Sequence, residues 1–235
     1  MAHTYSSSGT YVVKINSNSG NYRPRFIDSG DEDQIISIAV GSEDSAEFGT
    51  DISNAFHGSQ NMTKYNQVGA ATSNVTNFQA AWNSCSGLTT FPLIDTSSAT
   101  SFHFTWAECS GFTAFPLIDT SNATTLRSAW SGCSGITGTF PSIDTSSATR
   151  VDSGWKNCSG LTTFPLINTS SVTNFNQSWN GCTGLTTFPL INTSSGINFV
   201  STWENCTGIG GSFPLIDTSS GTNFSLARIV TGKQS

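Results

Sequence analysis

The chain repeats one stretch from residue 82 onward: Trp82-Asn-Ser-Cys85-Ser-Gly87-Leu88-Thr-Thr-Phe91-Pro-Leu-Ile94-Asp95-Thr-Ser97. Tryptophan returns about every 24 residues, and a cysteine follows three positions later each time. A fixed period of this length is typical of a solenoid in which each repeat packs only on its neighbours. We therefore expect these side chains to form the structural core of the repeats: Trp82, Trp106, Trp130, Trp155, Trp179, Trp203, Cys85, Cys109, Cys133, Cys158, Cys182 and Cys206.

Each repeat is expected to hold one short strand and one short helix. The strand is predicted over residues 88–93, with Phe91 and Ile94 starting two inward columns. Apolar residues at 99, 102, 106 and 109 follow the N-cap residues 95–98 and predict one face of a helix. Gly87 and its equivalents, two residues after each cysteine, predict left-handed helix ends. The predicted fold class is an α/β repeat solenoid of the leucine-rich-repeat type, with a parallel strand and a short helix per coil and a β lead-in at the N-terminus.

The chain divides into three parts. Residues 1–49 are predicted to be an N-terminal β lead-in or cap, with strands including residues 11–15 and 34–40. Residues 50–81 are a degenerate founding coil, in which Phe56 stands for tryptophan and Ser59 for cysteine. Residues 82–235 are the repeat solenoid of six repeats, the last one truncated where Arg228 takes the tryptophan place.

Composition and charge exclude some partners. Charged residues make up only 10% of the chain, and the net charge is −6 with nine Lys and Arg in total. No basic stripe is available to neutralise phosphates, so nucleic acid is not expected as a partner. No apolar run approaches the ~18 residues of a membrane helix, and residues 1–18 lack the pattern of a signal peptide. Abundant Ser, Thr, Asn and Gly indicate an extracellular location or a cell or virion surface.

The repeat resembles the BspA-like leucine-rich repeats of bacterial surface proteins, including mycoplasma surface lipoprotein repeats. The resemblance rests on Trp179-Asn-Gly-Cys182-Thr-Gly-Leu185-Thr-Thr-Phe188 and on the Asp-Thr-Ser of residues 95–97. It differs in having Trp for the usual Phe, Phe102 or Phe175 for the usual Met, and a unit shorter by about two residues. Residues 3–15 also resemble the closing strands of PKD-type β-sandwiches. The resemblance implies a surface-displayed module for adhesion, and the family has no catalytic residues to carry over.

The cysteine column has three possible interpretations: disulfides, a metal ladder or buried thiols. Helices stacked at ~8 to 10 Å would hold successive Cα atoms beyond the ~7 Å that a disulfide spans. No cysteine has a histidine or second cysteine at ligand spacing, so zinc is not expected. Buried free thiols are therefore favoured.

A second column could bind calcium between coils, or each member could cap its own turn. Its members are Asp95, Asp119, Asp144, Asn168, Asn192 and Asp217. The exchange of Asp for Asn favours capping. An outward column could match an ice or carbohydrate surface, or be ordinary exposed strand residues: Thr89, Thr113, Thr137, Thr162 and Thr186.

The predicted function is a non-enzymatic, surface-exposed repeat module that binds a protein or glycan along its strand-side face. No catalytic, cofactor-binding or metal site is expected, because His3, His57 and His103 share no context with a nucleophile. The alternative is a structural protein that assembles head to tail into an extracellular filament or virion component. Its candidate assembly ends are Tyr11, Val13, Ile15, Phe224, Leu226, Ile229 and Val230.

Overall fold

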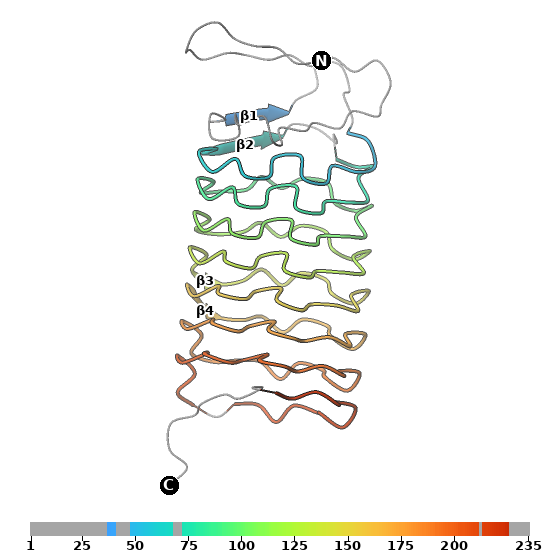
Figure 1. Ribbon diagram of the computed structural model, residues 1–235, viewed down its shortest axis with the longest axis vertical. Helices are drawn as coiled ribbons and strands as arrows, with labels where there is room; N and C mark the ends of the chain where they lie inside the picture. The colour runs from blue at the N-terminus through green and yellow to red at the C-terminus, as the bar shows by residue number, and fades with distance from the viewer. Residues whose placement is uncertain (1–36, 41–47, 68–71, 212, 226–235) are drawn as a thin grey trace, which may run out of the picture.

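The computed structural model describes residues 37–40, 48–67, 72–211 and 213–225. In Figure 1 the chain winds into a stack of coils that follow one another in sequence order. Parallel bridges join equivalent residues of successive coils: Asp51, Asn77, Ser101, Thr125, Arg150, Asn174, Asn198 and Asn223. Each coil is therefore bonded to the coil before it and the coil after it.

Strands occupy little of the stack. β1 (Ser37–Val40) pairs in parallel with β2 (Lys64–Gln67), and β1 lies within the segment where a strand was predicted. β3 (Gly138–Thr139) pairs in parallel with β4 (Leu161–Thr163), with a register shift at residues 138–139. In other coils this face has single bonds, such as the Thr113 N–H to the Thr89 carbonyl at 3.1 Å. The proline that follows each phenylalanine has no N–H to donate, which keeps the paired runs short.

The predicted α/β repeat solenoid, with a strand and a helix in each coil, is wrong. The described residues contain no helix and only these four short strands. Where a helix was expected, alternate amides bond to the next coil. Thus Phe102 N–H donates to Thr125 O and Trp106 N–H to Ala129 O, at 3.1 and 2.9 Å. The amides between them close single turns, such as Cys109 N–H to Trp106 O at 3.2 Å.

Left-handed residues also prevent a helix in this segment. Phe104 and Glu108 have φ of 55° and 61°, and in the next coil Ser128 and Gly132 have 52° and 76°. Two such residues, four positions apart, interrupt each coil, whereas a right-handed helix requires negative φ throughout. The spacing of three, four and three residues between apolar side chains therefore comes from successive single turns.

The glycine two residues after each cysteine is needed for a different reason from the one predicted. Gly135 does not have positive φ. A Cβ on Gly135 would stand 2.3 Å from Ser110 O and 2.6 Å from Phe112 O, both backbone atoms of the preceding coil. The same holds for Gly111, Gly160, Gly184 and Gly208. These glycines let successive coils approach each other closely.

The interior of the stack is a set of aromatic columns. All six tryptophans are buried, and successive rings stack with centroids 5.5–6.0 Å apart. A phenylalanine column meets them edge-on, as Phe91 does Trp82 at 4.8 Å. Such offset and T-shaped arrangements are the preferred ring geometries. The indole N–H groups of the tryptophan column have no hydrogen-bond partner within the described part of the chain.

The six cysteines are free and buried beside this column. Each thiol donates to a main-chain carbonyl of the preceding coil, as Cys109 Sγ does to Trp82 O at 3.0 Å. Burial raises the pKa of Cys206 to about 12 and raises the pKa of Cys133 and Cys182 well above the ordinary value. The thiols therefore serve as packed hydrogen-bond donors between coils.

Candidate binding face

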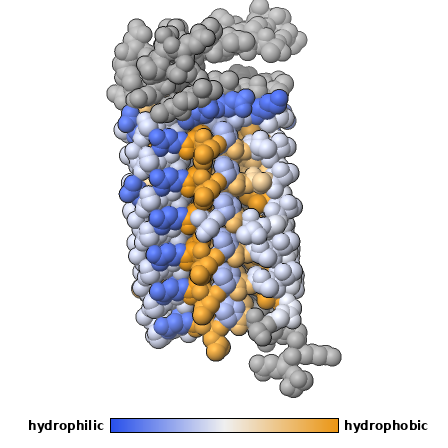
Figure 2. Space-filling model, turned by 180° about the vertical axis from the view of Figure 1, so that it is seen from behind, coloured by the Kyte–Doolittle hydropathy of each residue, from blue (hydrophilic) through white to orange (hydrophobic). Residues whose placement is uncertain are grey.

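A stripe of exposed leucines runs along the stack. Their side chains are 60–95% exposed, one in each of five coils. This leucine stripe consists of Leu93, Leu117, Leu166, Leu190 and Leu215, and Ser142 takes the equivalent place in the third repeat. Figure 2 shows it as an orange line on one face of the molecule.

The local sequence explains why these leucines face outward. Leu93 comes directly before the buried Ile94, and adjacent residues of an extended segment point to opposite sides. Leu93 is therefore exposed, and the same holds in each repeat that carries Phe-Pro-Leu-Ile. Phe91, three residues before Ile94, is also buried, so strict alternation does not run through the whole segment. The sequence analysis did not single out this stripe. Strict alternation would not have revealed it, because alternation places Leu93 on the same side as Phe91, which was assigned to the interior.

The Asp/Asn column follows the leucine stripe two residues along the chain, and Figure 2 shows a hydrophilic column beside the orange stripe. Asp95 Oδ1 accepts the Ser97 N–H at 3.0 Å and the Ser97 hydroxyl at 2.7 Å. Equivalent bonds to the serine N–H are formed by Asp119, Asp144, Asn168, Asn192 and Asp217. Each member therefore closes its own turn, as capping predicts.

These hydrogen bonds favour the charged form of the carboxylates. The bonds from Ser97 lower the pKa of Asp95, and those from Ser146 and Ser219 lower the pKa of Asp144 and Asp217. The described residues hold no group of three or more His, Cys, Asp or Glu side chains suited to a metal ion. The column is best described as a row of negative charges interrupted by two asparagines.

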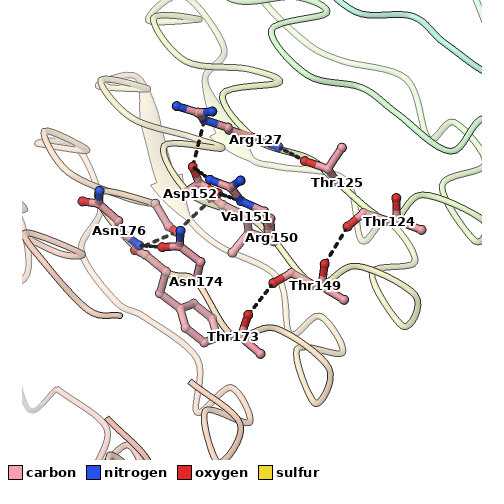
Figure 3. A network of polar contacts seen from close by, with 12 residues as sticks. Thr124, Thr125, Arg127, Thr149, Arg150, Val151, Asp152, Thr173, Asn174 and Asn176 are labelled. Atoms are coloured by element: carbon pink, nitrogen blue, oxygen red, sulfur yellow. Dashed lines mark hydrogen bonds and ion pairs between the residues drawn. The ribbon is translucent and has the colours of Figure 1, made fainter. Parts of the chain in front are cut away.

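Two of the outward threonines, Thr113 and Thr186, donate their hydroxyl hydrogens to the protein itself, and so do threonines beside the column. Thr186 Oγ1 donates to Thr162 O at 3.1 Å, and Thr139 and Thr163 share a hydroxyl bond of 2.5 Å. At another edge a second threonine ladder does the same, each Oγ1 donating to the carbonyl of the preceding coil: Thr100, Thr124, Thr149 and Thr173. Figure 3 shows the last three. Hydroxyl hydrogens used in this way are not available to an ice or sugar surface.

A charged cluster lies in the segment of the coils where a helix was expected. Asp152 is buried and pairs with Arg127 at 3.0 Å and with Arg150 through two bonds of 2.9 Å (Figure 3). His103 is half-buried and stacks on Phe104 with ring centroids 4.3 Å apart. Burial, together with the positive charge of Arg127, lowers the pKa of His103. The paired charges link neighbouring coils, and this arrangement serves as a structural ion pair.

Most of the candidate assembly ends lie outside the described residues. These are Tyr11, Val13, Ile15, Leu226, Ile229 and Val230. Phe224 is described: it stacks on Phe199 at 5.4 Å and is 42% exposed. Head-to-tail assembly stays a prediction.

No family model, curated protein or solved structure matches the chain. The resemblance to BspA-like repeats and to PKD-type strands stays a prediction. Among the residues that the structure describes, none form a helix that could span a lipid bilayer.

Proposed function

We propose that the chain is a non-enzymatic, surface-displayed repeat module that binds a protein partner along the leucine stripe. The observation that carries the proposal is the row of leucines, 60–95% exposed, held at one place in five of the six repeats. Contiguous exposed apolar patches are uncommon on soluble proteins and mark interaction sites. The coils beneath are closely packed, so the stripe is presented on a rigid support.

A protein partner is favoured over a glycan. An apolar centre with a polar margin is the usual composition of a protein interface, and the Asp/Asn column supplies such a margin. Large exposed apolar side chains of the described region are the leucines, Ile197 and Phe224, with no tryptophan or tyrosine among them. The flat aromatic rings with a polar group that would suit a sugar ring are instead buried in the core.

Non-enzymatic binding is also supported by how the polar groups are used. Asp152 is engaged by two arginines, and Lys156 Nζ donates to Gln177 Oε1 at 3.0 Å. Burial raises the pKa of the Cys133 and Cys182 thiols well above the ordinary value, so these thiols are poor nucleophiles. These contacts stabilise the stack and offer no paired acid and base to a substrate.

The test combines a displayed library of random peptides with a glycan array, both probed with the full chain. The matched variant carries Leu117→Ser, Leu166→Ser and Leu190→Ser, which copy the serine already present at residue 142. We expect selected peptides that bind the native chain and lose about tenfold or more in affinity for the variant, because three buried contacts are removed. Peptides that bind both proteins equally, or glycan binding that survives the substitutions, would overturn the proposal.

A further inference from the structure

The charge around the leucine stripe is one-sided. Between each cysteine and the next Asp/Asn residue the repeats contain no lysine or arginine. The arginines and the lysine of the described repeats lie between an Asp/Asn residue and the next cysteine, at residues 127, 150 and 156. Two of them are paired with Asp152 and the third with Gln177. An apolar row is therefore bordered by carboxylates with no basic residue in the same segment.

The Asp/Asn column carries negative charge at neutral pH. Asp119, Asp144 and Asp217 are exposed and Asp95 is half-buried. Each carboxylate accepts the N–H of the serine two residues later. These bonds lower the pKa of Asp95, Asp144 and Asp217 and so favour their charged forms. A partner that covers the leucines must bring positive charge to this side or leave carboxylates desolvated and unpaired.

The repeat distance of the phenylalanine column beside the stripe is close to the rise of one α-helical turn. Successive rings of the phenylalanine column, two residues before the leucines, lie 5.6–6.2 Å apart. One turn of an α-helix rises about 5.4 Å. Across the six repeats the stripe is roughly 30 Å long, the length of a helix of about 20 residues. One helical turn can thus meet each coil.

We propose that the leucine stripe and the Asp/Asn column together dock a basic amphipathic helix of about 20 residues. Its apolar side chains, recurring once per turn, pack between the leucines, and its lysines or arginines on one flank face Asp95, Asp119, Asp144 and Asp217. This inference rests on the proposed function and names the partner's chemistry. A second copy of the chain is a poorer occupant, because two chains of net charge −6 repel each other.

The probe is a labelled synthetic peptide of about 20 residues with leucine on one helical face and lysine on the other. Binding to the full chain is followed by fluorescence anisotropy. We expect the affinity to fall about tenfold or more when salt is raised from low to about 1 M, where the Debye length is about 3 Å. The control peptides are the same composition scrambled to remove the apolar face, and a leucine and glutamate peptide; neither should bind.

Two variants of the chain separate the apolar and charged contributions. In the first, Leu117, Leu166 and Leu190 become serine, and affinity should fall about tenfold or more. In the second, Asp95→Asn, Asp119→Asn, Asp144→Asn and Asp217→Asn copy the asparagines at 168 and 192. This variant should lose about tenfold in affinity and most of the salt dependence. Unchanged tryptophan fluorescence shows that each variant keeps its buried column.

The outcomes distinguish this inference from the proposed function. Equal binding of the glutamate peptide, or unchanged binding by the asparagine variant, would overturn the basic helix. If the library yields peptides that depend on the leucines but lack the helical leucine and lysine pattern, the helix is wrong and the proposed function stands. If neither a leucine-dependent peptide nor a leucine-dependent dimer is found, both are wrong. Leucine-dependent dimers without peptide binding would identify a second copy as the occupant.

Discussion

Replacing Gly135 by alanine tests the close approach of successive coils. An added Cβ would stand 2.3 Å from Ser110 O and 2.6 Å from Phe112 O, and real Cβ atoms essentially never come within 3.0 Å of such atoms. The coil must therefore move away from its neighbour by about 0.7 Å. Both obstructing atoms are backbone atoms, so no side chain can rotate to relieve the contact.

The cost follows from the contacts that this movement disturbs. Overpacking of this kind costs about 1–3 kcal/mol, and two backbone contacts place it near the upper end. The neighbouring bond from Thr137 N–H to Thr113 O is already 3.2 Å long, so it would be lost at about 1 kcal/mol. We expect Gly135→Ala to lower the free energy of unfolding by about 3 kcal/mol and Tm by about 6–12 °C.

Two other glycines provide matched controls. Gly210 has no atom within 4 Å of an added Cβ and no positive φ, so alanine there should be neutral or stabilise by up to about 1 kcal/mol. Gly138 also has open space but φ of 78°, so alanine there should cost about 1–2 kcal/mol through backbone strain alone.

The three variants are compared by thermal and urea unfolding, followed through the buried tryptophans. The expected order of destabilisation is Gly135→Ala, then Gly138→Ala, then Gly210→Ala. A Gly135→Ala protein as stable as the native chain would refute the argument that these glycines are required by contact between coils. Equal losses at Gly135 and Gly138 would show that the contact between coils costs no more than backbone strain at a single residue.

Three further predictions concern the thiols, the ion pairs and the left-handed residues. Burial raises the thiol pKa of Cys133, Cys182 and Cys206, so the folded state holds these protons more tightly than the unfolded state. The free energy of unfolding should therefore be full below the unfolded thiol pKa of about 8.5 and fall as pH rises above it. Urea midpoints that stay constant to about pH 10 would contradict this. Asp152→Asn should lower the free energy of unfolding in urea by about 1–2 kcal/mol. The loss is smaller than for a fully buried ion pair because the arginine side chains are 43–44% exposed. An unchanged urea midpoint would show that the ion pairs contribute nothing to stability. Ser84→Gly should stabilise by up to about 1 kcal/mol, because φ of 61° strains a residue with a Cβ, and a lowered Tm would refute that reasoning.

The inward residues of each coil could be read from the sequence. Trp106 and Cys109 recur with the period, and a side chain that must stack on copies of itself is apolar in every repeat. The turn role of Asp95 was also accessible, because an Asp before Thr-Ser-Ser closes a local turn through the following amides. The exposed face at Leu93 was not accessible from alternation, because Phe91 and Ile94 both point inward and strict alternation cannot place residues three apart on one side.

The backbone conformation of residues 99–109, which include a tryptophan, could not be predicted from the local sequence pattern. A spacing of three, four and three between Ala99, Phe102, Trp106 and Cys109 is typical of a helix, but consecutive single turns give a similar spacing. What separates the two is where the amides bond: Phe102 N–H reaches Thr125 O, in the next coil.

The sequence by itself determined which side chains recur at each position, and so which columns form the core, the leucine stripe and the acidic border. Tertiary structure alone decided the backbone of each coil, including the left-handed φ at Phe104 and the contact that requires glycine at 135. The physical reason is that the hydrogen bonds and close contacts that hold the coil in this shape come from residues about one repeat away, so a short stretch of sequence cannot specify them.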